Sequence, residues 1–525
     1  MAEHKLKKLP LGYSDFKRIV DEDCVYVDKT QLIHQMITSG GYYFLSRPRR
    51  FGKSLLVSTL TELFFGNKDL FKDLWISKSD YSWSQHPVIR FDFSTIGHRT
   101  LSDLINNINV RLDDIAHDYA IDVSRYPSID SKFQNLIVQL AKINKVVILI
   151  DEYDKPILDH IDTIDEAKTQ REVLKSLYSV IKGSDQYLRF VLLTGVSKFL
   201  KTSIFSGINN LIDISMDERY ATMLGYTHDE LGRYFNNYLV RFSAKLNKTP
   251  KLLEAQLLDY YDGYQFAENS ERMFNPFSVM CSLDAQKFEN YWFATGTPTF
   301  LVQLLQKNEY DLESVTQPVL NAEDLGSFEL DNIPLPSLLF QTGYLTIKEY
   351  DSKTNNYTLG IPNKEVNNGF TRQLVNTFTL LPADKSIQYA RRITRAFNHE
   401  DMANLLQTLQ EFFNRMPYTV HIKSESQLQF VLYAIFALIG VTVDPEVTTS
   451  LGRADLVVSL AKLVYIIELK FNKTAQEALV QIQDKKYYEK YVNFGKQIFL
   501  LGINFDQPTK SVSIESQKIK NELDL

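Results

Sequence analysis

Three consecutive residues, Gly52, Lys53 and Ser54, have the chemistry needed to hold a phosphate chain. They stand between a short apolar run, Tyr42–Leu45, and a stretch with helical spacing. Backbone N–H groups at a helix start attract phosphate oxygens, the lysine reaches the β- and γ-phosphates, and the serine hydroxyl ligates Mg²⁺. The first glycine of the usual P-loop pattern is replaced by Arg47. A basic turn between a strand and a helix is therefore the alternative.

A pair of acids, Asp151 and Glu152, directly follows five apolar residues at 146–150. Such a run is typical of a parallel strand buried on both faces, and its carboxyl end is where open α/β sheets bind ligands. We expect Asp151 to hold Mg²⁺ and Glu152 to polarise the water that attacks the γ-phosphate. Thr194 ends a later apolar run and is a candidate γ-phosphate sensor. A buried strand that ends in acids by chance is the alternative, but the P-loop in the same chain favours ATP binding.

A second group of candidate catalytic residues, Asp455, Glu468 and Lys470, lies near the end of the chain. Twelve residues separate Asp455 from Glu468, enough for a hairpin that brings them together. Glu468 and Lys470 are two apart, so on a strand they share one face. This set suits metal-assisted phosphodiester hydrolysis, in which Asp455 and Glu468 bind Mg²⁺ and Lys470 orients the water or stabilises the charged transition state. An exposed Glu–Lys pair on a strand is the alternative.

Alternating strand and helix patterns position the first group. Apolar strand patterns occur at 42–45, 87–94, 146–150, 188–195 and 209–216, with helical patterns between most of them. This alternation predicts a doubly wound, mostly parallel sheet, and we assign it to a P-loop domain at 1–225.

The rest of the chain divides into two predicted parts. Residues 226–416 are mostly helical. They also contain two apolar runs, Tyr344–Ile347 and Tyr357–Ile361, around a polar turn, a helix-then-hairpin pattern found in winged helices. Residues 417–525 start with an apolar helix from Glu425 and continue with the strands that carry the second group. We therefore expect an α/β multidomain protein with a helical, winged-helix-like middle and a C-terminal α/β domain.

Bulk properties narrow the functional classes. The chain has 525 residues, 23% of them charged, and a net charge of −6, which gives no general sign of nucleic-acid binding. Its two cysteines cannot form a disulfide framework, so we expect a cytoplasmic protein. The N-terminus lacks the apolar region of a signal peptide, and the longest apolar run, Phe430–Val443, is too short to span a bilayer. We expect no membrane partner, and the sequence leaves open whether the chain forms a homo-oligomer.

Residues from about 11 to 224 resemble the AAA-ATPase-like family of bacterial P-loop proteins. The matching motifs are GYSDF, YVDKT, RPRRFGKS, LIDEYDKP, LTGVSKF and SIFSGINNL. That family accepts a residue other than glycine at the position of Arg47. The resemblance implies ATP and Mg²⁺ as cofactors, with Arg49 and Arg50 near the phosphates or on a partner strand. On the residues alone, both arginines could equally be surface charges.

The pattern Asp455-x₁₂-Glu468-Leu469-Lys470 resembles the PD-(D/E)xK nuclease superfamily, whose fold is that of restriction endonucleases. Glu425 matches its helical acid and Gln481 its motif on the following helix. The resemblance implies an ATP-regulated, Mg²⁺-dependent nuclease that acts on DNA, in particular DNA of phage or mobile elements. One rival is a signalling ATPase whose C-terminal domain binds nucleic acid or partners without cutting. The other is an ATP-driven scaffold whose C-terminal domain mediates oligomerisation.

Overall fold

The computed structural model describes residues 6–198, 210–294, 312–326, 330, 334–379, 381–416, 422–438, 442–449 and 452–519. Within the SIFSGINNL motif, residues 203–209 lie outside these ranges, as does Phe199 of the LTGVSKF motif. The chain forms two compact units. The first unit comprises Met1–Thr295 and Val319–Glu365, and the second comprises Gly296–Pro318 and Val366–Leu525.

The first unit is built on a parallel sheet. Its strands are β1 (Tyr42–Ser46), β2 (Val88–Asp92), β3 (Val146–Asp151), β4 (Leu188–Gly195) and β5 (Ile212–Asp213). The order is β2-β3-β4-β1-β5, and all paired strands are parallel. This confirms the doubly wound sheet predicted from the sequence. All six residues of β3 are buried, because helices cover both faces of the sheet.

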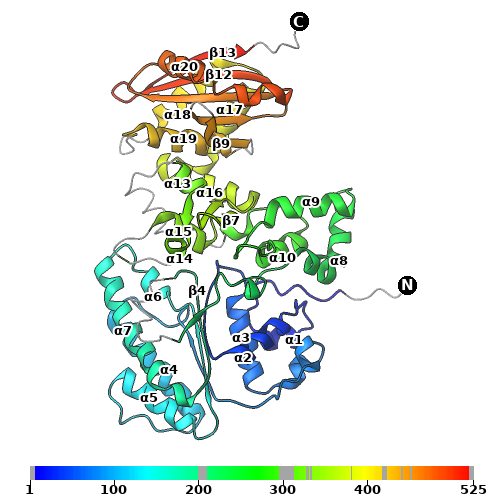
Figure 1. Cartoon of the computed structure of the whole chain (residues 1–525), viewed down its shortest axis with the longest axis vertical. Helices are drawn as coiled ribbons and strands as arrows, with labels where there is room; N and C mark the ends of the chain where they lie inside the picture. Colours follow the sequence, from blue (N-terminus) through cyan, green and yellow to red (C-terminus); the bar gives the residue numbers. More distant parts are fainter. Residues whose placement is uncertain are drawn as a thin grey trace. The chain divides into compact units, whose positions relative to one another are not determined.

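Helices cover this sheet on two sides (Figure 1). One group comprises α1 (Phe16–Asp21), α2 (Thr30–Ser39) and α3 (Lys53–Phe64), and the other α4 (Leu101–Asp118), α5 (Ile129–Leu140), α6 (Lys155–Leu158) and α7 (Ile164–Gly183). Short 3₁₀ helices lie at η1 (Lys68–Phe71), η2 (Trp75–Lys78), η3 (Asp185–Tyr187) and η4 (Glu218–Tyr220). In α4, Leu104, Ile108 and Leu112 recur every fourth residue and are buried, as an amphipathic helix requires.

The first unit continues with a helical region and a small sheet. The helices are α8 (His228–Lys245), α9 (Pro250–Tyr261), α10 (Pro276–Ala285), α11 (Tyr291–Ala294), α14 (Ala322–Gly326) and α15 (Leu335–Thr342). The predicted hairpin is present as β7 (Thr346–Asp351) and β8 (Asn356–Gly360), which pair antiparallel directly after α15. A third strand, β6 (Val319–Asn321), pairs with β8. With three residues it is too short to show an alternating pattern in the sequence.

The second unit contains helices and a mixed sheet. The helices are α13 (Leu312–Thr316), α16 (Lys364–Thr379), which continues from the first unit, α17 (Ala383–Asn398), α18 (Met402–Arg415), α19 (Glu425–Ala437), α20 (Ala475–Asp484) and the 3₁₀ helix η5 (Glu489–Phe494). The strands are β9 (Thr442–Thr449), β10 (Gly452–Ser459), β11 (Leu463–Phe471), β12 (Gln497–Asp506) and β13 (Ser511–Ile519), in the order β13-β12-β11-β10-β9.

The connections of this second sheet position its polar residues. β10 and β11 form the predicted antiparallel hairpin. β11 and β12 are parallel, and α20 connects them and packs on both. In α18, Leu405, Leu409 and Phe412 are buried and lie on one face of the helix. Within the described ranges no helix is both long and apolar enough to cross a membrane.

Candidate active sites

The loop between β1 and α3 has the geometry of a phosphate-binding turn. Gly52 has a φ of +99°, a backbone conformation that favours glycine, and Lys53 is the first residue of α3. The Lys53 side chain is buried, and its Nζ donates to the carbonyl oxygens of Arg47 at 2.8 Å and Pro48 at 3.1 Å. Ser54 follows in the first helical turn. The Lys53 ammonium is thus hydrogen-bonded to its own loop, next to the N–H groups at the start of the helix, which have no partner within the helix.

A cavity of about 490 Å³ opens on this loop. Polar residues of its lining include Lys53, Ser54, Glu152 and Lys155. Apolar residues of its lining include Val25, Val27, Ile33, Met223, Leu224 and Met280. A lining that combines charged groups with apolar side chains suits a ligand with a phosphate chain and a base, such as a nucleotide.

Asp151 lies at the carboxyl end of β3 and is fully buried. Its Oδ1 accepts hydrogen bonds from Thr194 Oγ1 at 2.6 Å and from the Glu152 amide at 3.1 Å. Its Oδ2 is buried and accepts no hydrogen bond. A buried carboxylate oxygen without a partner is unfavourable, and a cation would compensate it. The residues therefore fit a Mg²⁺ ion held by Asp151 and Ser54.

Glu152 lines the cavity in a strained backbone conformation, with a φ of +52°. Burial raises the pKa of Glu152, and the nearby Lys53 ammonium partly opposes this. Burial lowers the pKa of Lys53, and the charges of Glu152 and Asp151 oppose this decrease. The two acids and the lysine thus interact electrostatically with one another.

Asp154, from the same sequence motif, is tied into the fold. It is buried, and its Oδ2 accepts hydrogen bonds from the amides of Val196 at 3.0 Å and Ser197 at 2.6 Å, and from the Ser197 hydroxyl at 2.6 Å. These bonds fix the end of β4 beside the end of β3. Asp154 is thus occupied by structural contacts, in contrast to the cavity-lining Glu152.

The three arginines of the loop take different positions. Arg47 is 2% exposed, its Nη1 donates to the carbonyl of Ser215 at 2.6 Å, and its guanidinium lies 4.2 Å from the centre of the Phe266 ring. Burial lowers the pKa of Arg47 to about 9. Arg49 and Arg50 line the cavity. The position of Arg47, where a glycine is usual, thus serves to anchor the loop.

Residues far along the sequence cover this loop, and sequence reasoning did not assign them to the site. The Trp292 indole Nε1 donates to the carbonyl of Arg49 at 3.1 Å. Gly343 has a φ of +90°, and a Cβ there would meet Pro48 at 2.6 Å. The Arg50 guanidinium lies 4.7 Å from the centre of the Phe277 ring. In the sequence, the one sign of these contacts is that Phe277 and Trp292 lie in stretches rich in aromatic residues.

The second site is centred on Glu468 in β11, which is 2% exposed. Its Oε1 accepts hydrogen bonds from Lys470 Nζ at 3.0 Å and from Gln481 Nε2 of α20. Its Oε2 is buried and accepts no hydrogen bond. Burial raises the pKa of Glu468 to about 7, although the Lys470 ammonium opposes the change. The arrangement leaves one carboxylate oxygen for a further ligand.

The other residues predicted for this site converge on the same point. Asp455 lies in β10 directly before Leu456, which pairs with Ile467 of β11. The Asp455 Oδ2 accepts a hydrogen bond from the Leu469 amide at 2.7 Å. Glu425, the first residue of α19, lies 3.7 Å from Lys470 Nζ. Burial alone would lower the pKa of Lys470, but Glu468, Glu425 and Asp455 outweigh it and raise that pKa. The ammonium therefore stays charged.

The acids of this site fit Mg²⁺, which proteins commonly bind through one or two carboxylates and water. Asp455 and Glu468 supply these carboxylates, and the unpartnered Glu468 Oε2 is the observation that supports the fit. Among the residues that the structure describes, no group of three or more His, Cys, Asp or Glu side chains is placed to hold a metal ion. A metal here would thus depend on two acids and on solvent.

Comparison with known proteins matches two regions of the chain to known families. A family model described as "Predicted AAA-ATPase" matches residues 10–205, and one described as "PD-(D/E)XK nuclease superfamily" matches residues 423–515. The "Uncharacterized protein in vnfD 5'region" of Azotobacter chroococcum mcd 1 is 37% identical over 519 residues, which are 96% of this chain and 98% of that protein. The chain belongs to the AAA-ATPase-like family.

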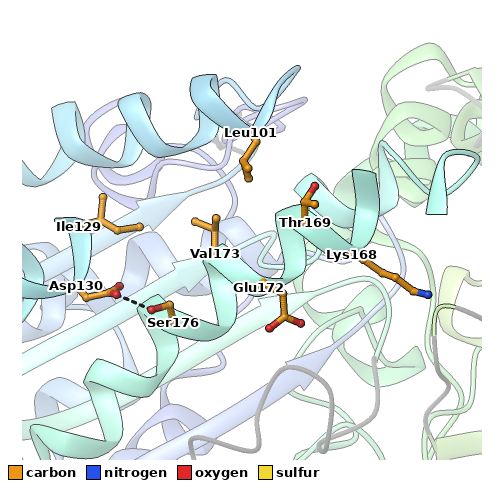
Figure 2. A pocket seen from close by; sticks show the side chains of 8 residues that line it. All are labelled: Leu101, Ile129, Asp130, Lys168, Thr169, Glu172, Val173 and Ser176. Atoms are coloured by element: carbon orange, nitrogen blue, oxygen red, sulfur yellow. Dashed lines mark hydrogen bonds between the residues drawn. The ribbon is translucent and has the colours of Figure 1, made fainter. Parts of the chain in front are cut away.

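In this AAA-ATPase-like protein the two matched regions fall in different compact units, and each contains one of the two candidate sites. The ATPase-like region also has a separate surface hollow of about 500 Å³ beside α4, α5 and α7 (Figure 2). Asp130 accepts a hydrogen bond from Ser176 there, and Leu101 and Val173 add apolar surface. The site residues predicted from the sequence do not line this hollow.

Proposed function

We propose that this AAA-ATPase-like protein binds and hydrolyses ATP in residues 1–225 and that nucleotide state controls a Mg²⁺-dependent nuclease in residues 417–525. Residues 226–416 connect the two. The proposed substrate is DNA, and the proposed role is defence against phage or mobile elements. The observation that carries the nuclease is the convergence of Lys470 and Gln481 on one oxygen of Glu468, whose other oxygen is buried without a partner.

In the proposed ATPase each residue has a separate task. Lys53, now bonded to two loop carbonyls, turns to the β- and γ-phosphates. Ser54 and Asp151 would hold Mg²⁺, which would neutralise phosphate charge. Glu152 orients and polarises the attacking water, and its raised pKa makes it a better proton acceptor. Thr194 holds Asp151 through a 2.6 Å hydrogen bond and can respond to the γ-phosphate.

In the proposed nuclease Asp455 and Glu468 would hold the metal, which would supply Lewis-acid stabilisation of the scissile phosphate. Lys470 orients the attacking water or stabilises negative charge in the transition state. Gln481 fixes the orientation of the Glu468 carboxylate through its amide. Glu425 lies 3.7 Å from Lys470 Nζ and helps to keep it protonated.

A cleavage assay tests the nuclease. Full-length protein is incubated with plasmid DNA and with RNA, with and without ATP and Mg²⁺. Wild type should nick DNA only with Mg²⁺, and Asp455→Ala, Glu468→Ala and Lys470→Ala should each abolish nicking, because residues of one site act as a unit. Lys473→Ala, at an exposed neighbouring lysine, is the matched control. ATP hydrolysis should persist in all variants.

A second candidate is a switch ATPase whose C-terminal domain binds nucleic acid or partners without cutting. Among the described residues no three His, Cys, Asp or Glu side chains, Glu425 included, are grouped so that they could hold a metal ion, which favours this candidate. DNA binding without nicking by wild type would support this candidate. A wild-type protein that neither binds nor nicks DNA would instead support the scaffold whose C-terminal domain mediates oligomerisation.

A further inference from the structure

The segment 485–496, between α20 and β12, differs in charge from the chain as a whole. It contains four lysines, Lys485, Lys486, Lys490 and Lys496, and one acid, Glu489, whereas the whole chain has a net charge of −6. Lys485, Lys486 and Lys490 are exposed. Glu489 lies 3.4 Å from Lys486, and both side chains are more than half exposed, so this ion pair is weak. Asp444 is a second acid that interacts with the segment, through Lys490. The lysines still leave a positive excess.

The same segment presents an aromatic ring to solvent. Phe494 is 58% exposed, one of the most exposed large apolar side chains among the described residues. Its ring packs edge-to-face on Tyr491, with the ring centres 5.6 Å apart and the planes at 86°. Tyr491 is buried and belongs, with Tyr487, to the hydrophobic core that lies under α20 and β10. Phe494 is therefore a mostly exposed ring that packs against a buried neighbour, and its exposed surface is available for stacking.

This segment adjoins the proposed nuclease site. The Tyr487 hydroxyl lies 3.5 Å from Gln481 Nε2, and the same amide donates to Glu468 Oε1. A Cβ placed on Gly452, three residues before Asp455, would lie 3.1 Å from the Tyr487 ring. Tyr487, which lies in the segment 485–496, thus connects this segment to the Glu468 site, and a polymer bound at that site can extend onto the segment.

We infer that residues 485–496 bind a polynucleotide strand with unpaired bases, which stacks a base on Phe494 and places phosphates against Lys485, Lys486 and Lys490. Lysines neutralise the phosphate backbone, and an aromatic face stacks any unpaired base, so the two together suit a single strand or the open end of a duplex. The inference rests on the proposed function, because it assigns the substrate-holding surface of that nuclease. An acidic protein partner would use the lysines but has no base to stack on Phe494.

The test measures binding of short labelled single-stranded DNA, single-stranded RNA and blunt duplex DNA to the full-length protein in EDTA, where cleavage is not supported. Phe494→Ala should weaken binding of single strands roughly tenfold and of the duplex much less. Phe494→Tyr should restore it, which separates stacking from damage to the fold. The matched control is Phe65→Ala, a 38% exposed phenylalanine in the first unit, and it should change nothing. The DNA and RNA arms show which strand is preferred.

A salt titration tests the lysines separately. Each phosphate contact to a single strand contributes about 0.7 to the slope of log affinity against log salt concentration. Replacing Lys485, Lys486 and Lys490 together by Gln should therefore reduce the magnitude of this slope by about 2. Single-strand binding that is unchanged within about twofold in Phe494→Ala, or wild type that binds no strand, overturns the inference.

Cleavage in Mg²⁺ distinguishes this outcome from failure of the nuclease proposal. Wild type that binds strands through Phe494 without cutting supports the inference and contradicts the nuclease. Cutting that persists in Phe494→Ala with unchanged strand binding contradicts the inference alone.

Discussion

The buried carboxyl of Glu365 should make the stability of the first unit depend on pH. Glu365 is 0% exposed, and its Oε1 accepts a hydrogen bond from the Trp292 amide at 2.7 Å, while its Oε2 is buried and accepts none. Burial raises the pKa of Glu365 from 4.5 to about 7. The Trp292 indole in turn donates a hydrogen bond to the Arg49 carbonyl oxygen of the P-loop. The Glu365 carboxyl therefore helps to position Trp292 against the candidate nucleotide site.

The sign follows from proton binding. Between pH 4.5 and about 7 the folded state keeps the Glu365 proton, whereas the unfolded state has lost it. The free energy of unfolding therefore falls as the pH rises through this range, and the contribution is fully present only below pH 4.5. A rise of the pKa from 4.5 to about 7 corresponds to roughly 3 kcal/mol lost by the time the pH exceeds 7.

Glu365→Gln keeps the shape of a neutral carboxyl and removes the titration. We expect the variant to resemble wild type near pH 5 and to be more stable at pH 8, by up to about 3 kcal/mol. Urea unfolding followed by tryptophan fluorescence measures this, because Trp75, Trp83 and Trp292 all lie in the first unit. Glu271→Gln, at an exposed position, is the control and should leave the pH profile unchanged.

Two results would refute this reasoning. One is a wild-type unfolding free energy of the first unit that does not change between pH 5 and 8. The other is a Glu365→Gln variant that loses the same stability at both pH values. The second result would mean that the carboxylate accepts hydrogen bonds that an amide cannot replace, and that Glu365 is ionised in the folded protein.

Three further predictions concern the nucleotide site. Lys53→Ala should abolish binding of ATP with Mg²⁺ in calorimetry, because Lys53 supplies the ammonium that the loop aims at the phosphates, and equal binding by the variant would contradict the P-loop assignment. Glu152→Gln should retain bound ATP without turnover, whereas Asp151→Ala should lose the Mg²⁺-dependent part of the affinity; a Glu152→Gln variant that hydrolyses ATP at the wild-type rate would exclude Glu152 as the base. Gly343→Ala should lower the stability of the first unit by about 2–4 kcal/mol and weaken ATP binding, because it combines a φ of +90° with a Cβ 2.6 Å from Pro48. Thermal melting with and without ATP measures the last effect, and the exposed Gly232, which has open space around it, provides Gly232→Ala as the control.

Local patterns in the sequence were sufficient to predict the elements and many contacts of the second site. The two-residue spacing of Glu468 and Lys470 puts both on one face of a strand, and Lys470 Nζ lies 3.0 Å from Glu468. The twelve-residue separation from Asp455 predicted the β10–β11 hairpin, which is confirmed. The apolar run before Asp151 predicted a strand buried on both faces, and β3 is one. These features depend on periodicity and on chain reach, which neighbouring residues determine.

The sequence did not reveal which distant residues would meet. Asp151 contacts Thr194 because β4 lies between β1 and β3, an order that depends on the packing of the whole sheet. Arg47, which looked like a defect in the P-loop pattern, proves to be a buried anchor over Phe266, more than two hundred residues later.

The cover of the loop by Trp292 and Gly343 likewise joins segments separated by hundreds of residues. Such contacts form because burial of aromatic surface and satisfaction of backbone carbonyls favour one packing of the complete chain. By itself the sequence predicted which residues could do chemistry, and it determined the strand or helix that carries many of them. Only the tertiary structure decided which of their oxygen atoms are left without a partner, because that depends on every neighbour that packing brings within hydrogen-bonding distance.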